Sequence, residues 1–173
     1  MTNVNDTLHF IMTGGTIDSY YDGIRDTVTP FEHSFVPQFM KLIKTYDECV
    51  FTEACMKDSR ELDESDRRKI LEAVSGSSSR RIIVTHGTYT IPETARYLKE
   101  NLGNHDKTVI IVGSMIPLAG VTPTDAGFNL GFAVAESKNL PAGIYACMNG
   151  TVFASDSVRK DVAEGRFSSF FTK

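Results

Sequence analysis

The first element of the chain is written in Leu8-His9-Phe10-Ile11-Met12-Thr13-Gly14-Gly15-Thr16-Ile17, where an apolar run passes directly into two glycines and a threonine. The apolar run predicts a buried strand, and the glycines after it predict a tight turn. Glycine gives this turn backbone angles that are closed to other residues and lets it approach a ligand closely. We therefore expect the Thr16 hydroxyl and the N–H groups that follow it to face one pocket.

On its own, such a turn is more typical of an ordinary strand-to-loop connection in a nucleotide- or phosphate-binding fold. The same pattern occurs a second time, however, in Arg81-Ile82-Ile83-Val84-Thr85-His86-Gly87-Thr88. Two apolar strands that each end in a glycine-threonine turn indicate a shared site more specifically than either turn alone.

Strands and helices alternate along the rest of the chain. Further strands are expected at 49–56, 108–112 and 140–148, and helices at 35–46, from 63, at 91–102 and from 122. Apolar strands that are each followed by a helix predict a mainly parallel sheet with helices on both faces, an α/β fold of three layers with a doubly wound sheet. The polar, glycine-punctuated segment 19–26 is expected to be a mobile loop that covers Thr16 as a lid.

Three hydroxyl side chains follow the ends of three different expected strands. Thr16 follows the first strand, Ser59 the second and Thr88 the third. Ligands of such sheets bind beyond the carboxyl ends of the strands, near the point where the strand order reverses. We therefore expect these three side chains to meet in one pocket.

Composition limits the class of protein. The chain has 173 residues, of which 41% are hydrophobic and 23% charged, which predicts one soluble globular domain over residues 1–173. A net charge of −4 argues against a nucleic-acid partner, because such binding needs clustered positive charge. The N-terminus lacks the basic and apolar regions of a signal peptide, and no apolar run approaches the ~20 residues that span a bilayer. We expect a cytoplasmic protein without a membrane partner.

The sequence predicts no metal site and no cofactor. Cys49 and Cys55 would lie about 20 Å apart on one extended segment, which is too far for a disulfide, and Cys147 belongs to a later strand. All three are expected to be reduced thiols. The histidines are scattered rather than clustered at ligand spacing: His9, His33, His86 and His105.

Several motifs occur together in a particular order. They are Thr13-Gly14-Gly15-Thr16-Ile17, Thr85-His86-Gly87-Thr88, Val112-Gly113-Ser114-Met115-Ile116-Pro117-Leu118, Thr124-Asp125-Ala126-Gly127-Phe128-Asn129-Leu130 and Val158-Arg159-Lys160. Over nearly its whole length, the chain resembles the amino-terminal domain of the bacterial-type L-asparaginase and glutaminase family. The resemblance implies a flavodoxin-like fold and hydrolysis of a small-molecule amide or amino-acid substrate without a cofactor.

The resemblance also implies roles for individual residues. Thr16 and Thr88 match the two catalytic threonines of the family, and Lys160 matches the lysine that assists the second one. Ser59 matches the serine that binds the substrate α-carboxylate, and Gly87 belongs to the second turn beside the substrate. Neutral lysine is a competent base only where burial or nearby positive charge lowers its pKa.

The chain departs from the family at one position of the site. The family has an aspartate directly after the second threonine, which orients the lysine and holds the substrate ammonium, whereas this chain has Tyr89. A phenol with a pKa near 10 is neutral and supplies no such charge. Glu61 or a group from a partner is a candidate replacement for the missing charge, and either Tyr20 or Tyr21 is a candidate for the loop tyrosine. We expect weak activity on free L-asparagine and better acceptance of ligands whose amine is blocked or absent.

A second departure is length. Members of the family are about twice as long, because they have a second domain. That domain contributes side chains to the site of a neighbouring subunit. We expect a single N-terminal-type domain without the C-terminal domain, and self-association as a homodimer or a higher homo-oligomer.

Three functional hypotheses remain open from the sequence. The leading one is an asparaginase-type amidohydrolase that cleaves a carboxamide through Thr16 as nucleophile. The alternative is a non-catalytic small-molecule-binding or regulatory module that kept the fold, which Tyr89 favours. A third is a mononucleotide-binding protein that uses the glycine turn to hold an anion.

Overall fold

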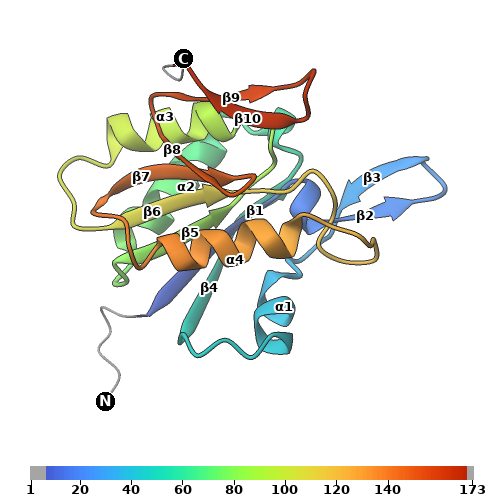
Figure 1. Cartoon of the computed structure of the whole chain (residues 1–173), viewed down its shortest axis with the longest axis horizontal. Coiled ribbons are helices and arrows are strands. Elements are labelled where there is room, and N and C mark those ends of the chain that lie inside the picture. The colour runs from blue at the N-terminus through green and yellow to red at the C-terminus, as the bar shows by residue number, and fades with distance from the viewer. Residues whose placement is uncertain (1–6, 171–173) are drawn as a thin grey trace.

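A computed structural model describes residues 7–170, and its centre is one six-stranded sheet in the order β4-β1-β5-β6-β7-β8 (Figure 1). The strands are β1 (Leu8–Gly14), β4 (Cys49–Lys57), β5 (Arg81–Thr85), β6 (Thr108–Val112), β7 (Gly143–Met148) and β8 (Thr151–Ala154). All neighbours pair in parallel except β7 and β8. The predicted α/β class with a mainly parallel sheet is therefore confirmed.

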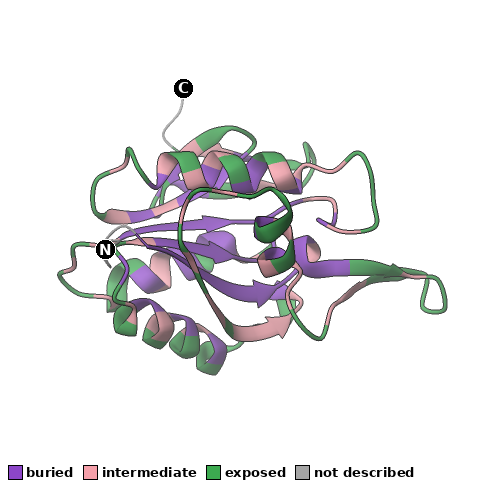
Figure 2. Cartoon of the chain, turned by 90° about the horizontal axis from the view of Figure 1, so that it is seen from below, coloured by how far each residue is buried: buried purple, intermediate pink, exposed green. Residues whose placement is uncertain are grey.

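Helices cover both faces of this sheet, so the three layers are also confirmed. They are α1 (Val36–Leu42), α2 (Glu64–Gly76), α3 (Ile91–Asn101) and α4 (Ala126–Glu136). Figure 1 shows α4 in front of the sheet and α2 with α3 behind it, where α2 contacts α3. In Figure 2 the buried residues form a band through the strands, while the outer faces of the helices are exposed. Every residue of β1 and of β6 is buried, and these strands lie at the centre of the core.

The order of the parallel strands decides where a ligand can bind. Counted along the chain, the five parallel strands are arranged 2-1-3-4-5, which is the flavodoxin-like order. The chain therefore leaves β1 towards one edge for β4 and returns across β1 to β5. The reversal places the expected ligand site beyond the carboxyl ends of β1 and β5.

Segment 19–26 is not the mobile loop that the sequence predicted. It lies in an antiparallel hairpin of β2 (Ser19–Asp22) and β3 (Thr27–Pro30), which Figure 1 shows projecting from the body of the molecule. The Tyr21 hydroxyl donates a hydrogen bond to Asp26 within this hairpin. The alternation of side chains along four-residue strands was too short a pattern to outweigh the polar composition.

The expected helix from 122 was also wrong at its start, because α4 begins at Ala126. The carboxylate of Asp125 accepts hydrogen bonds from the N–H groups of Met115 and Ile116, both at 2.9 Å, and from the Asn129 side chain of α4 at 3.0 Å, but from no backbone N–H group of α4. The Thr124 hydroxyl donates to the Ile116 carbonyl at 3.1 Å. The residues before α4 therefore hold the loop that follows β6.

The helix expected over 35–46 is shorter than its apolar pattern suggested. α1 ends at Leu42, and its buried side chains are Val36 and Met40. Leu42 and Tyr46 are exposed instead of forming part of a buried stripe. The periodic pattern continued past the end of the helix into the turn before β4.

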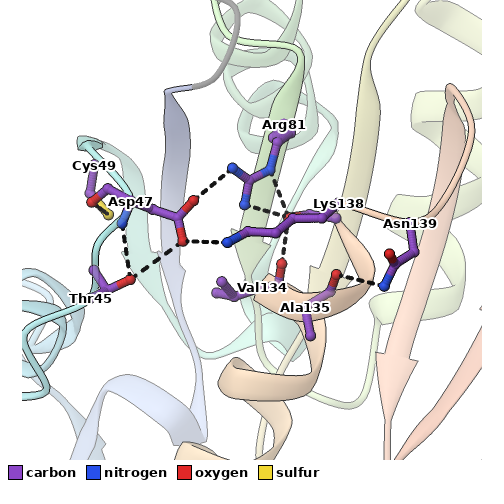
Figure 3. A network of polar contacts seen from close by, with 9 residues as sticks. Thr45, Asp47, Cys49, Arg81, Val134, Ala135, Lys138 and Asn139 are labelled. Carbon is purple, nitrogen blue, oxygen red and sulfur yellow. Dashed lines mark hydrogen bonds and ion pairs between the residues drawn. The ribbon is translucent and has the colours of Figure 1, made fainter. Parts of the chain in front are cut away.

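A polar network closes the opposite, amino-terminal end of the sheet (Figure 3). Arg81 begins β5, and its guanidinium lies 2.7 Å from the carboxylate of Asp47. The same carboxylate lies 3.1 Å from the ammonium of Lys138. Arg81 also donates to the hydroxyl of Ser137 at 3.1 Å, just beyond α4. The network fixes the start of the central strand between two connections.

Two expectations about membrane spans and cysteines can be checked in the described residues. Within residues 7–170, no helix is long and apolar enough to cross a membrane. Cys49, Cys55 and Cys147 are free thiols, as predicted.

Candidate active site

The two glycine-threonine turns lie side by side at one rim of the sheet. β1 and β5 are parallel neighbours, so both turns leave the same edge. Gly14 and Gly15 have φ angles of +85° and +80°, which side-chain-bearing residues rarely adopt. A Cβ atom added to Gly15 would lie 2.2 Å from the Cα atom of Gly87. The turns therefore pack backbone against backbone, and only glycine permits this approach.

Ser59 joins the same rim from the end of β4. It opens a short 3₁₀ helix, η3 (Ser59–Glu61), and its side chain is buried. A Cβ atom on Gly87 would lie 2.6 Å from the Ser59 hydroxyl oxygen. The Thr90 hydroxyl donates to the Ser59 carbonyl at 2.9 Å, which ties η3 to the second turn. The strand order brings the three segments to one edge, but the predicted meeting of the three side chains in one pocket is not seen, because only Thr16 of the three lines the pocket at this edge.

Lys160 reaches this rim from a part of the chain in which the sequence revealed no strand. It lies in β9 (Val158–Asp161), which forms a hairpin with β10 (Arg166–Ser169) next to α3 (Figure 1). The Lys160 Nζ atom lies 2.7 Å from the Thr88 hydroxyl oxygen. Burial lowers the pKa of Lys160, and the positive charge of Arg60 lowers it further, while Asp58 opposes the shift. These influences favour the neutral amine, which can accept a proton from Thr88.

Tyr89 places an aromatic ring between two cationic side chains. The Lys160 Nζ atom lies 3.7 Å from the centroid of the ring, and the Arg60 guanidinium carbon lies 5.2 Å from it. Both cations are attracted by the negative face of the ring. Arg60 also forms a two-pronged ion pair with Asp58, with N–O distances of 3.1 and 2.6 Å.

A pocket of about 130 Å³ opens beside Thr16. Thr16 itself is partly exposed, whereas Thr88 is buried. The β2–β3 hairpin supplies one wall, and the other side is supplied by η3 and the residue before it. The lining residues are Gly15, Thr16, Ser19, Thr27, Val28, Pro30, Asp58 and Arg60. Thr16 is therefore the threonine that a ligand in this pocket can reach.

Of the site residues named from the sequence, only Thr16 lines this pocket. Glu61 is exposed at the end of η3, so its part in substrate binding stays a prediction. Tyr20 packs against Phe31, with ring centroids 5.3 Å apart, and Tyr21 bonds Asp26. Asp58 and Arg60, which flank Ser59, were not predicted. Their pattern in the sequence is only that of a solvated loop.

His86 is part of the frame of the second turn. Its Nδ1 atom lies 2.8 Å from the Gly87 carbonyl oxygen, and its Nε2 atom lies 2.9 Å from the Thr94 hydroxyl. Complete burial lowers the pKa of His86 to about 4. A neutral ring with both nitrogens engaged positions the turn and has no free nitrogen for proton transfer.

Asn129 supports the loop beside Thr88. Its amide nitrogen donates to the Gly113 carbonyl at 3.1 Å, and its oxygen accepts from the Asn149 N–H at 3.2 Å. A Cβ atom on Gly113 would lie 2.5 Å from the His86 carbonyl and 3.1 Å from a methyl carbon of Thr88. The buried Asn129 amide thus fixes the Gly113 loop where its backbone packs closely against the second turn.

Comparisons with known proteins agree with this architecture. A family model described as "Asparaginase, N-terminal" matches residues 7–171. The glutaminase-asparaginase of Acinetobacter glutaminasificans is 38% identical over 101 residues, which make up 55% of this chain and 29% of that protein. L-asparaginase 2 of Escherichia coli strain K12 is 37% identical over 81 residues, or 45% of this chain and 23% of that protein.

Solved structures show the same fold. The thermostable L-asparaginase from Thermococcus kodakarensis superposes with a TM-score of 0.81 at 22% identity, over 96% of this chain and 52% of that one. L-asparaginase I from Vibrio cholerae gives a TM-score of 0.77 at 25% identity, over 95% of this chain and 51% of that one. The chain therefore spans about half the length of these structures and a smaller share of the curated relatives that it matches.

Proposed function

Because the chain belongs to the asparaginase family through its N-terminal domain, we propose that it is an amidohydrolase that cleaves the carboxamide of asparagine or a related small amide. The observation that carries this proposal is the contact of 2.7 Å between Lys160 and Thr88. A lysine whose pKa is lowered and which touches a buried hydroxyl is arranged as a base. A binding module has no need of this arrangement.

The proposed reaction begins with Thr16. Its hydroxyl oxygen attacks the amide carbon, a C–O bond forms, and the C–N bond breaks to release ammonia. Lys160, acting through the Thr88 hydroxyl, takes the nucleophile's proton, and the leaving nitrogen takes up a proton as it departs. Water then attacks the ester, releases the acid and restores the Thr16 hydroxyl.

The remaining side chains and backbone groups of the rim bind the substrate in this proposal. Ser59 holds the carboxylate of the substrate. Gly87, which has no side chain, lets the substrate approach the second turn without a clash. The N–H groups of the two glycine turns face the oxygen that becomes negative in the transition state. Glu61 remains a proposed contact at the outer edge, and no cofactor takes part in this scheme.

Ammonia release from L-asparagine, L-glutamine and small amides tests the proposal. We expect Thr16→Ala to abolish release, with Thr151→Ala, on exposed β8, as the matched control that keeps it. Lys160→Met is expected to lower kcat by at least a hundredfold, whereas Lys41→Met, at an exposed position of α1, is expected to leave it unchanged. Full ammonia release by Thr16→Ala would show that Thr16 is not the nucleophile.

The alternative function is a non-catalytic binding or regulatory module, and Tyr89 is the observation that favours it. A neutral ring stands where the family has an aspartate that orients the lysine and holds the substrate ammonium. Saturable binding of small carboxylates without ammonia release from any amide would favour this alternative. Binding of mononucleotides instead would point to the glycine turn as an anion-binding loop.

A further inference from the structure

Several cationic side chains lie around Tyr89, and they would repel the ammonium group of asparagine. Beyond the ring lies a second pocket of about 230 Å³, which shares Tyr89 and Lys160 with the site. Its charged lining residues are Glu93, Arg96, Arg159 and Lys160. Arg60 adds a further cation, 5.2 Å from the centroid of the ring.

Two carboxylates near the ring, those of Asp58 and Glu93, are already paired with arginines. Asp58 accepts both prongs of the Arg60 guanidinium, and it accepts the Arg60 N–H at 2.9 Å as well. Glu93 lies 3.8 Å from Arg96 on the same helix turn. Among residues 7–170, no ion pair joins Lys160 to a carboxylate. A substrate at the ring therefore meets Arg60 and Lys160, whereas the carboxylate closest to Arg60, that of Asp58, is already paired with it; Glu61 is exposed at the outer end of η3.

We propose that this site selects small amides that carry a carboxylate and lack a free ammonium, such as the monoamide of a dicarboxylic acid, and that Tyr89 and Arg60 determine this selection. The inference rests on the proposed function, whose site it specifies further. It follows from one ring that holds two cations at 3.7 and 5.2 Å from its centroid.

The physical reason is the permanent charge of Arg60. An ammonium beside the ring would compete with Lys160 for the ring face and would be repelled by Arg60. That repulsion persists when Lys160 is neutral, because a guanidinium stays protonated at every working pH. A carboxylate or a neutral group at the same place meets no such repulsion, and Asp58 takes up only two of the five N–H donors of the Arg60 guanidinium. The field instead draws the negative substrate into the pocket.

The decisive measurement is kcat/KM for succinamate, N-acetyl-L-asparagine and L-asparagine at one pH. We expect the two amides without an ammonium to exceed L-asparagine at least tenfold. Tyr89→Asp is expected to reverse this preference, while Tyr89→Phe keeps the ring and keeps the preference. Tyr46→Asp adds the same charge at a fully exposed position far from the second turn, and is the control that leaves the ratio unchanged. Equal or better turnover of L-asparagine by the native protein would overturn the inference.

A binding measurement separates this inference from the proposed function. If no amide releases ammonia, the proposed function fails, and calorimetry with succinate and L-aspartate still tests the charge selection. Tighter binding of succinate, weakened several-fold by Arg60→Gln, supports the inference. Equal binding, tighter binding of L-aspartate, or binding of neither at millimolar concentration overturns it.

Discussion

The contact between Gly87 and Ser59 gives the sharpest test of how the rim is built. In Gly87→Ala, the new Cβ atom would lie 2.6 Å from both Cβ and Oγ of Ser59 and 3.1 Å from its backbone nitrogen. Ordinary contacts of a Cβ atom begin at about 3.4 Å, so η3 must move by roughly 0.8 Å. Inserting a methyl group into such a packed place costs about 1–3 kcal/mol of the free energy of unfolding.

The same displacement would move the Ser59 hydroxyl away from the proposed carboxylate position. We expect KM to rise at least tenfold for any substrate that is turned over, because an interaction of about 1.4 kcal/mol is worth a factor of ten. Urea unfolding measures the stability change, and steady-state kinetics measure KM. Gly76→Ala is the matched control, because no atom lies within 4 Å of its new Cβ atom at the end of α2.

Two results would refute this reasoning. One is a Gly87→Ala protein as stable as the native protein, which would mean that η3 is free to move. The other is a lower stability with an unchanged KM, which would separate Ser59 from substrate binding. The control is expected to stabilise the protein by up to about 1 kcal/mol, as for glycine to alanine in a helix.

Other predictions concern the polar networks, the base and the assembly. Asp47→Ala is expected to lower the free energy of unfolding by about 3 kcal/mol, because it leaves Arg81 without its carboxylate; Asp106→Ala, at an exposed ion pair with Arg80, is expected to cost less than about 1 kcal/mol. Ion pairing holds the pKa of Asp47 below its usual range, so the native advantage over Asp47→Ala is present above pH ~4 and is lost as the pH falls through the lowered value. If Lys160 is the base, activity rises with pH as its amine loses its proton, and Arg60→Gln should move that rise to higher pH while Arg60→Lys does not; a pH profile that neither change moves would contradict the role of Arg60. Sedimentation is expected to show a homodimer or larger assembly, and a monomer at every accessible concentration would refute self-association.

Patterns that repeat along the chain predicted the fold well. Continuous apolar runs predicted the parallel strands at 8–14, 81–85 and 108–112, because burial on both faces of a parallel sheet demands them. The Asp63 cap of α2 was equally readable, since its carboxylate and that of Asp66 cap the helix reciprocally. The short strands of the two hairpins were missed because four residues give too little periodicity to outweigh polar composition.

The candidate site was predictable only as far as its glycine turns. Thr16 and Thr88 follow apolar strands, so strand order brings their turns together whatever surrounds them. The place of Lys160 depends on a hairpin that packs beside α3, and only the motif resemblance had marked it. Arg60 could not be predicted from the sequence, because an exposed arginine near an aspartate is ordinary in a loop. Its contact with Tyr89 arises only when η3 meets the second turn.

These placements change the meaning of Tyr89. The sequence alone indicated that tyrosine in place of an aspartate removes the negative charge that would bind the substrate ammonium. In the structure, an aspartate beside Lys160 would stabilise the protonated lysine and raise its pKa, whereas burial first and the charge of Arg60 second lower the pKa of Lys160. We therefore expect the same substitution to weaken recognition of free asparagine and, because it brings no negative charge, to favour the neutral base more than an aspartate would. For this reason, loss of the acid does not by itself argue for loss of catalysis, and activity should be sought on amides without an ammonium.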